Sequence, residues 1–293
     1  MELYYHFCGA DFRIDTPQPL WEEPDALQFR VSPCENPRFH LTLETQPVVH
    51  RPEGRFLGRR GEKSLWRTMR QVSRTTTDIF RKQPHMCVTY PLEQASPVRC
   101  IVRENAWKWA TRSSFFWPGV SLNQLLLHVN ALVFHASYIC WQGRAILFTA
   151  PSQTGKSTQA ALWEQYRGAE LINGDKAAVK LGETASACGL PFCGTSGVCK
   201  NRTMPLRCVV VLSQAPENTV RRLGPTEALP LLCQNLFSDD LIYEEWQLSM
   251  QLLLDMLQQV PVYALACRPD EGAVLALEEA MARDGLTAQE VQP

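Results

Sequence analysis

An apolar run, a short loop and a helical stretch follow one another in the middle of the chain, and this order constrains the fold more than any other feature. The run AILFTA, residues 145–150, is strand-like, and STQAALWEQY, residues 157–166, has the composition of a helix. Between them Ala150 is followed, after four residues, by Gly-Lys-Ser. A glycine-bearing loop between a strand and a helix is the context that a phosphate-binding loop requires. The sequence therefore predicts an α/β domain that binds a nucleotide here.

The chemistry of such a loop assigns a role to each of its central residues. Successive backbone N–H groups surround the β-phosphate, and the following helix presents its positive end to the same group. Lys156 would reach the β- and γ-phosphate oxygens, and Ser157 would offer a hydroxyl to Mg²⁺. A glycine at position 155 allows the backbone to approach phosphate closely. The predicted nucleotide-binding residues are Ser152, Gln153, Thr154, Gly155, Lys156, Ser157 and Thr158.

A second apolar strand follows and ends at an acidic residue. The segment GAELINGDKAAVKL runs into Asn173-Gly174-Asp175-Lys176. An acidic residue at the end of a strand beside a phosphate loop usually acts on Mg²⁺ or on the attacking nucleophile. Asp175 is therefore the candidate for both roles. The alternative is a turn aspartate that binds backbone amides, because Asn-Gly-Asp is also favourable turn chemistry.

Together these motifs resemble a known family. His135 begins the strand-like HASYICWQGRAIL, Lys156 follows twenty-one residues later, and the next apolar strand ends in GDK. The arrangement is similar to the C-terminal catalytic domain of HPr kinase/phosphorylase, whose nucleotide fold resembles that of phosphoenolpyruvate carboxykinase. The closer resemblance is to HPr-kinase-like bacterial proteins, some of which are linked to modification of ribosomally made peptides. It covers roughly residues 120–240.

The resemblance implies a fold, an activity and a set of site residues. The fold would be α/β, a phosphoenolpyruvate-carboxykinase-like mixed sheet with flanking helices. The activity would be ATP- and Mg²⁺-dependent transfer of the γ-phosphate to a hydroxyl, that of a serine in a peptide or protein acceptor. By the same resemblance Lys156 binds the phosphates, Ser157 and Asp175 serve the metal, and Asp175 orients or deprotonates the acceptor hydroxyl. His135 would lie close to the transferring phosphate, although a lone histidine on an apolar strand is as often a hydrogen-bonded core residue.

One departure from the family opens an alternative. True HPr kinase has two adjacent aspartates where this chain reads Gly174-Asp175-Lys176, so only one carboxylate remains. Lys176 could instead offset phosphate charge, since phosphoryl transfer depends mainly on positioning and electrostatics. The alternative function is a catalytically weak ATP-binding module that regulates a peptide or protein partner. A small-molecule phosphotransferase or carboxykinase fits less well, because the chain is short for that class and has no further recognisable set of metal ligands.

A second glycine-rich stretch, CGTSGVCKNRT, follows at residues 193–203. It could close over the nucleotide or present the acceptor, as loops do in phosphotransferases. The alternative is an ordinary surface loop, because glycine, serine and threonine mark loops in general. The candidate substrate residues in it are Gly194, Ser196, Lys200 and Arg202.

The chain divides into two regions that differ in their residue patterns, 1–117 and 118–293. The first consists of short extended runs separated by turn residues, among them ALQFRVS at 26–32, and is predicted to be mostly antiparallel β. Residues 64–82, which include Ile79 and Phe80, fit either a helix or strands, and strands are favoured because of the three consecutive threonines. In the second region Ser121 is a plausible helix N-cap, and Gln142-Gly143 a tight turn between two strands.

Residues 51–82 contain ten basic residues and three acidic ones. They could form a solvated face, or a patch that attracts an acidic peptide or phosphate. The whole chain has a formal net charge of -1, which indicates no general attraction to nucleic acid or membrane.

The eleven cysteines are scattered, without a C-x-x-C pair, and indicate neither a disulfide framework nor a zinc site. The spacing of Cys188, Cys193 and Cys199 matches no zinc pattern. No signal segment or membrane span is apparent, so a cytoplasmic protein is expected. The resemblance to HPr kinase also implies a homo-oligomer, although the sequence indicates no interface.

Overall fold

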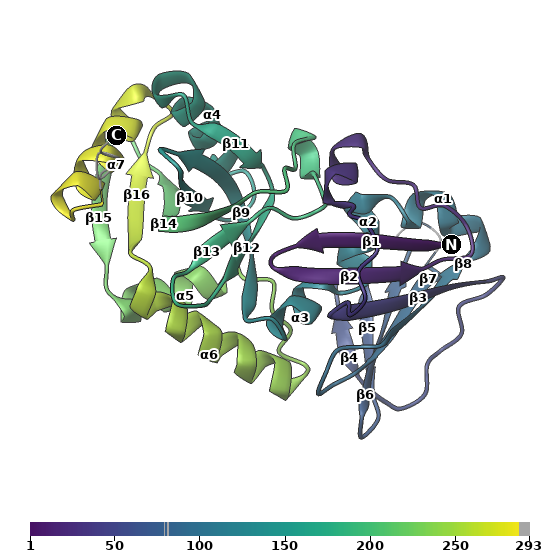
Figure 1. The fold of residues 1–293 in the computed structure, drawn as a ribbon. Coiled ribbons are helices and arrows are strands. Elements are labelled where there is room, and N and C mark those ends of the chain that lie inside the picture. The colour runs from purple at the N-terminus through teal and green to yellow at the C-terminus, as the bar shows by residue number, and fades with distance from the viewer. Residues whose placement is uncertain (79, 81, 287–293) are drawn as a thin grey trace. The chain divides into compact units, whose positions relative to one another are not determined.

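The computed structural model describes residues 1–78, 80 and 82–286 (Figure 1). The chain forms a mixed α/β structure with two compact units. The first unit contains residues 1–129 and 238–247, and the second contains residues 130–237 and the chain from Leu248 onward. The first unit thus runs past residue 117, where the sequence analysis placed its boundary. Residues 287–293 of the predicted second region lie outside the described residues.

The first unit is built on one large sheet. Within the described residues its strand order is β1-β2-β3-β8-β7-β6-β5-β4. Neighbouring strands are antiparallel except at β2–β3 and β3–β8, which are parallel. The prediction of a mostly antiparallel β region is therefore confirmed. The strands are β1 (Glu2–Phe7), β2 (Ala10–Asp15), β3 (Phe39–Gln46), β4 (Arg55–Arg60), β5 (Lys63–Arg67), β6 (Gln71–Thr77), β7 (Pro84–Pro91) and β8 (Val98–Arg103).

The ambiguous segment at 64–82 forms strands rather than a helix, as favoured. It contains most of β5 and all of β6, which pair antiparallel to each other. Residues 72–76 of β6 are buried in succession. Because successive side chains point to opposite faces, both faces of the sheet are covered at this strand. Ile79 lies outside the described residues.

The run ALQFRVS was expected to be extended, and this is wrong for most of it. Residues Pro24–Phe29 form a 3₁₀ helix. Pro24 fixes a helical φ at its start, and Ala26 and Phe29, three residues apart, both point into the core. The spacing of those two apolar residues was the available signal. The unit also has a second short 3₁₀ helix (Glu104–Ala106) and helices α1 (Trp107–Ala110), α2 (Ser113–Gly119) and α3 (Leu122–Leu127).

Ser121 occupies the N-cap position of α3 but does not cap it through its side chain. Its backbone has a φ of 59°, in the left-handed region, whereas a capping serine is normally extended. Its hydroxyl is buried with no hydrogen-bond partner among the described residues. A helix does begin after Ser121, as predicted, but the capping role was wrong.

Acidic residues from much later in the chain pair with several arginines of the basic segment. Arg60 binds Asp240, and Arg67 binds Glu244. The guanidinium of Arg74 is buried and binds Glu245, which also accepts a hydrogen bond of 2.7 Å from the Tyr90 hydroxyl. These arginines therefore belong to intramolecular ion pairs, an outcome that neither sequence interpretation included.

The second unit is built on another mixed sheet. Within the described residues its strand order is β10-β9-β12-β13-β14-β16-β15, with β11 paired to β9. Because β10 also pairs in parallel with β14, strands β9, β10, β12, β13 and β14 close into a ring. The strands are β9 (Ala131–Trp141), β10 (Arg144–Thr149), β11 (Glu170–Asn173), β12 (Lys176–Lys180), β13 (Ser186–Cys188), β14 (Thr203–Gln214), β15 (Thr219–Leu223) and β16 (Val262–Cys267).

The predicted hairpin and the strand–loop–helix order are both confirmed. Gln142 and Gly143 have φ values of 49° and 68°, as a tight hairpin turn between β9 and β10 requires. After the loop, α4 (Lys156–Arg167) packs on β9, β10 and β11 (Figure 1). The other helices are α5 (Pro225–Cys233), α6 (Tyr243–Gln259) and α7 (Glu271–Arg283), and Gly194–Ser196 form a 3₁₀ turn.

Buried aromatic packing fixes the position of α4. Trp163 of the helix is fully buried, with its ring centroid 4.9 Å from that of Trp141 on β9. Phe148 of β10 packs on the same indole. The helix ends at Gly168, which has a left-handed conformation and donates its N–H to the carbonyl of Glu164. The start of α4, and with it the predicted phosphate loop, is thereby held at one end of the sheet.

Candidate active site

The predicted phosphate loop connects β10 to α4, with Gly155 as the N-cap of the helix. Gly155 has a φ of 117°, a conformation that favours glycine. Apart from its immediate chain neighbours, no described residue has an atom within 4 Å of the place where a Cβ would be. Ser152, Gln153, Ser157 and Thr158 are exposed, and Thr154 and Gly155 are partly exposed. The first turn of α4 and its free N–H groups are thus open to a ligand.

Lys156 is folded back over this loop. Its ammonium donates hydrogen bonds of 2.9 Å to the carbonyl of Ala150 and 3.2 Å to that of Pro151. The residue is only 7% exposed, and burial lowers the pKa of the amine, an effect that the nearby Asp175 carboxylate opposes. The one cation of the loop is therefore held at the loop by backbone carbonyls.

Asp175 lies in a turn built by Asn173. The Asn173 side-chain oxygen accepts hydrogen bonds from the N–H groups of Asp175 (2.9 Å) and Lys176 (3.0 Å). Its amide nitrogen donates to the carbonyls of Phe192 (3.0 Å) and Leu190 (3.4 Å), and the residue is fully buried. Asn173, which the sequence analysis passed over, is thus the residue that orients the turn. An asparagine two residues before the aspartate was the available signal.

The Asp175 carboxylate is held between two other side chains. Its Oδ1 lies 3.5 Å from Nε2 of His135, and its Oδ2 lies 3.2 Å from the ammonium of Lys176. The hydrogen bond from His135, followed by the charge of Lys176, outweighs burial and lowers the pKa of Asp175 to about 2. The carboxylate is therefore ionised at neutral pH.

The sheet brings these groups together. On β9, His135 lies directly opposite Lys176 of β12, and Ala136 lies opposite Thr149 at the end of β10. The N–H of Ala136 donates 3.0 Å to the carbonyl of Asp175, and the Thr149 hydroxyl donates 3.0 Å to the carbonyl of His135. One strand thus places the start of the phosphate loop on one side and the Asp175 turn on the other.

Two aromatic rings surround the Lys176 ammonium. It lies 4.6 Å from the ring centroid of Phe192 and 5.1 Å from that of Phe237. Phe237 also packs edge-on to the imidazole of His135, at 6.3 Å. Because ring faces attract cations, these residues restrain Lys176 next to Asp175. Both phenylalanines come from segments far from the GDK motif, so local sequence gave no signal for them.

The second glycine-rich stretch packs directly on the Asp175 turn. A Cβ at Gly194 would lie 2.4 Å from the Cβ of Asp175, and a Cβ at Gly174 would lie 2.5 Å from the hydroxyl oxygen of Ser196. The Ser196 hydroxyl donates 3.0 Å to the carbonyl of Cys193. The stretch can pack on the Asp175 turn because neither glycine has a side chain. This packing brings Gly194 and Ser196 to the site.

Lys200 and Arg202 do not join this cluster. Both bind Glu170 at the start of β11, at 2.9 and 3.2 Å. The structure also joins Cys193 and Cys199 by a disulfide across the stretch, a bond that the cysteine spacing did not predict. That Lys200 and Arg202 contact the substrate stays a prediction. Glu170 neutralises both side chains, and the sequence alone did not indicate this partner.

The residues present fit a nucleotide better than a free metal ion. Within the described residues there is no group of three or more histidine, cysteine, aspartate or glutamate side chains that could hold a metal. The open helix N-terminus, the loop glycine and the Lys156 ammonium are the donors that a polyphosphate requires. Ser157 and Asp175 would then share Mg²⁺ with phosphate oxygens rather than bind it alone.

Comparisons with known proteins give little more. No family model and no curated protein matches the chain. Among solved structures, the HPr(Ser) kinase/phosphatase from Coxiella burnetii aligns with 53% of this chain and 90% of its own, at 14% sequence identity and a TM-score of 0.30. A similarity at this level carries no argument about function. Within the described residues, no helix is long and apolar enough to cross a membrane.

Proposed function

We propose that this protein is an ATP- and Mg²⁺-dependent phosphotransferase that transfers the γ-phosphate to a hydroxyl group, that of a serine in a peptide or protein. The observation that carries the proposal is that strand β9 holds the predicted phosphate loop on one side and the ionised carboxylate of Asp175 on the other. Lys156 lies at the loop, and the Asp175 carboxylate opposes the lowering of the Lys156 pKa by burial. Phosphoryl transfer needs this pairing of phosphate donors and a group that orients the acceptor.

Some of these residues would bind the phosphates, and Asp175 would orient the acceptor. The loop N–H groups and Lys156 would hold the β- and γ-phosphates, with Ser157 and Asp175 positioned to hold Mg²⁺, which supplies charge neutralisation at the phosphates. The acceptor oxygen forms a bond to the γ-phosphorus while the bond between that phosphorus and the bridging oxygen of ADP breaks. With its pKa of about 2, Asp175 acts by accepting a hydrogen bond from the acceptor hydroxyl and orienting it. It is too weak a base to keep the proton, which passes on to the phosphate product or to water.

His135 and Lys176 would then be positioning residues. Each lies on one oxygen of the Asp175 carboxylate, and the Phe192 and Phe237 rings restrain Lys176. The family that this sequence resembles has two adjacent aspartates over Gly174-Asp175-Lys176, whereas this chain has one carboxylate with the positive charge of Lys176 beside it. This charge could offset charge on the transferring phosphate, because fixed charges stabilise a transition state without reorganising.

One observation favours the second candidate, an ATP-binding module that regulates a peptide or protein partner. Both oxygens of the single site carboxylate already have partners, His135 and Lys176. A carboxylate so engaged has less capacity for an acceptor hydroxyl and a metal. In this case ATP would bind without turnover.

Substitution of Lys156 tests the nucleotide site itself. Lys156→Met keeps the length of the side chain and removes its charge, and loss of this charge-assisted contact should weaken ATP binding about tenfold to a hundredfold. Lys180→Met, at the far end of β12, is the matched control and should leave the affinity unchanged. The measurement is calorimetric titration of Mg-ATP. Equal affinity in the folded Lys156→Met variant would overturn the proposed nucleotide site.

Turnover separates the two candidate functions. ADP release, measured with and without a pool of synthetic serine peptides, distinguishes a phosphotransferase from a binding module. ATP binding with no ADP release in the presence of any peptide or of water would favour the regulatory module. ATP hydrolysis or peptide phosphorylation that depends on Asp175 would favour the phosphotransferase.

A further inference from the structure

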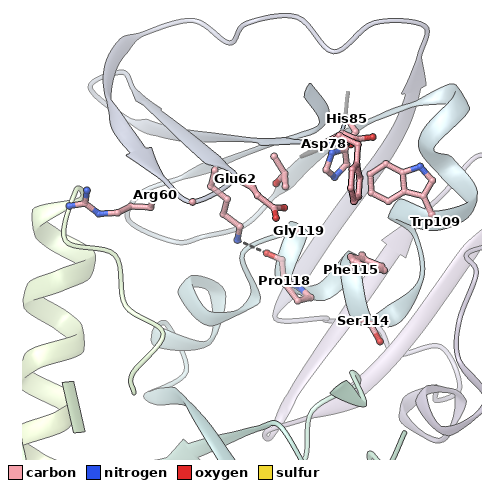
Figure 2. A pocket seen from close by; sticks show the side chains of 13 residues that line it. Arg60, Glu62, Asp78, His85, Trp109, Ser114, Phe115, Pro118 and Gly119 are labelled. Atoms are coloured by element: carbon pink, nitrogen blue, oxygen red, sulfur yellow. Dashed lines mark hydrogen bonds between the residues drawn. The ribbon is translucent and has the colours of Figure 1, made fainter. Parts of the chain in front are cut away.

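The first unit contains a pocket of about 810 Å³ that is separate from the residues of the candidate active site. Figure 2 shows its wall, with the rings of His85 and Trp109 side by side and the Phe115 ring facing the same space. Strands β4, β5, β6 and β7 and helices α1 and α2 contribute to the lining. This volume is typical of a site for a small organic ligand.

Aromatic rings form one side of the pocket. The ring centroids of His85 and Trp109 are 4.4 Å apart, and those of Trp109 and Phe115 are 6.2 Å apart with the rings nearly perpendicular. Phe115 is 53% exposed. Among the described residues, Trp109 is the one ring that packs against it. Perpendicular and offset rings at these spacings are the geometry in which a further aromatic ring packs well.

Two polar side chains in the wall have an atom with no hydrogen-bond partner among the described residues. These atoms are the Nδ1 of His85 and the hydroxyl of Thr76; both are buried, and the two residues are 7% and 8% exposed. Burial lowers the pKa of His85 to about 4 and outweighs the opposing charge of Asp78, so the imidazole is neutral at neutral pH. Both residues line the pocket. Leaving such atoms unpaired is unfavourable, and a ligand that satisfies them recovers the hydrogen bond.

The formal charges of the cationic and anionic lining residues sum to zero. Arg60 and Lys63 are cationic, and Glu62 and Asp78 are anionic. The Arg60 guanidinium binds Asp240, and the Lys63 ammonium donates 2.6 Å to the carbonyl of Pro118, as the dashed line in Figure 2 shows. The two cations are therefore already engaged, so among the described residues the lining offers no free cation that would select an anionic ligand.

From this geometry we infer that the pocket is a binding site for an aromatic ring that bears a neutral hydrogen-bonding group, of the phenol or indole type. The ring packs on Trp109 and Phe115, and its polar group binds His85 and Thr76. The volume exceeds that of one ring, so the ring is part of a larger ligand. It could belong to a free small molecule or to a tyrosine or tryptophan side chain of a polypeptide.

The test uses 4-fluorophenol as the probe, followed by ¹⁹F NMR titration of the full chain. Fluorobenzene, which has the same ring without the hydroxyl, is the matched ligand control. Thr76→Val removes the hydroxyl at nearly constant volume and should weaken 4-fluorophenol binding about threefold to tenfold, with a similar effect for His85→Phe. Thr75→Val is the matched protein control, because Thr75 is also buried but neighbouring strand residues point to opposite faces of the sheet.

The possible outcomes decide the inference. Binding of 4-fluorophenol that exceeds fluorobenzene binding, and that Thr76→Val weakens and Thr75→Val does not, supports it. No binding, equal binding of the two probes, or equal affinity in all folded variants overturns it. Thermal unfolding of each variant shows whether it is folded. Competition by N-acetyl-tyrosinamide, which carries the phenol on a peptide backbone, assigns the site to a polypeptide side chain, and absence of competition assigns it to a free small molecule.

Discussion

The Asp175 cluster of the second unit and the aromatic pocket of the first unit differ in how completely their polar groups are paired. Around Asp175 both carboxylate oxygens have partners, and so do both side-chain polar atoms of Asn173. In the pocket, His85 and Thr76 each have a buried atom that finds no partner in the part of the chain that the structure describes. A charge must be held in place before the reaction to stabilise a transition state, whereas a site that recognises a neutral ligand needs hydrogen-bonding capacity left open.

The largest expected effect comes from Asp175→Asn, which removes the charge and keeps the shape. If the carboxylate orients the acceptor hydroxyl, phosphoryl transfer should fall roughly 10²- to 10⁴-fold while ATP binding is largely kept. If it mainly holds Mg²⁺, the variant should instead bind Mg-ATP more weakly and metal-free ATP normally. Single-turnover transfer assays and ATP titrations with and without Mg²⁺ measure the two roles. A variant that matches the wild type in both would leave Asp175 as a turn residue.

A smaller effect is expected from Lys176→Met. Loss of a charge-assisted contact to Asp175 should lower transfer about tenfold. It should also raise the pKa of Asp175 from about 2 toward its ordinary value of 3.8, because the charge of Lys176 helps to lower it. The acid limb of the rate profile that belongs to Asp175 would then move to higher pH. Lys180→Met, on the same strand, is the control. An unchanged rate and an unchanged acid limb would show that Lys176 does not act on Asp175.

The glycine-rich stretch offers a matched pair of substitutions. Gly194→Ala and Gly197→Ala both place alanine at a positive φ, 53° and 69°, but only the first puts a Cβ in contact with Asp175. We expect Gly197→Ala to lower the free energy of unfolding by about 1 kcal/mol, and Gly194→Ala to lower it by about 2–4 kcal/mol and also to reduce transfer. Urea unfolding of both variants measures the difference. Equal losses would show that this stretch is not packed on Asp175 in solution.

The smallest effect concerns the pH dependence of the pocket. The pKa of His85 is about 4 in the folded protein, below the ordinary value of 6.5, because of burial. As pH falls from about 6.5 to about 4, the unfolded chain therefore takes up a proton that the folded protein does not, and stability decreases. His85→Phe should remove this part of the slope and leave the slope above pH 7 unchanged. Unfolding midpoints from pH 4 to 8 provide the test, and identical slopes would indicate a solvated imidazole.

Local sequence was sufficient for the elements around the phosphate loop. The strand AILFTA, the glycine at 155 and the helix after it were all predicted, and so was the tight turn at Gln142-Gly143. These features depend on short-range rules, namely apolar periodicity and glycine at positive φ. The 3₁₀ helix at Pro24–Phe29 was missed although Pro24 and the spacing of Ala26 and Phe29 were local signals for it. The conformation of Ser121 was missed because burial of this residue overrides local preference.

The sequence by itself determined that a glycine-bearing loop joins a strand to a helix and that an aspartate follows a later strand. Only the tertiary structure decided that His135 and Lys176 lie on the two oxygens of that aspartate, and that Phe192 and Phe237 surround the lysine. It likewise decided that Arg74 is buried against Glu245 rather than exposed in a basic patch. The physical reason is that strand pairing and ion pairing join residues far apart in the chain, and no local pattern records which partners will meet.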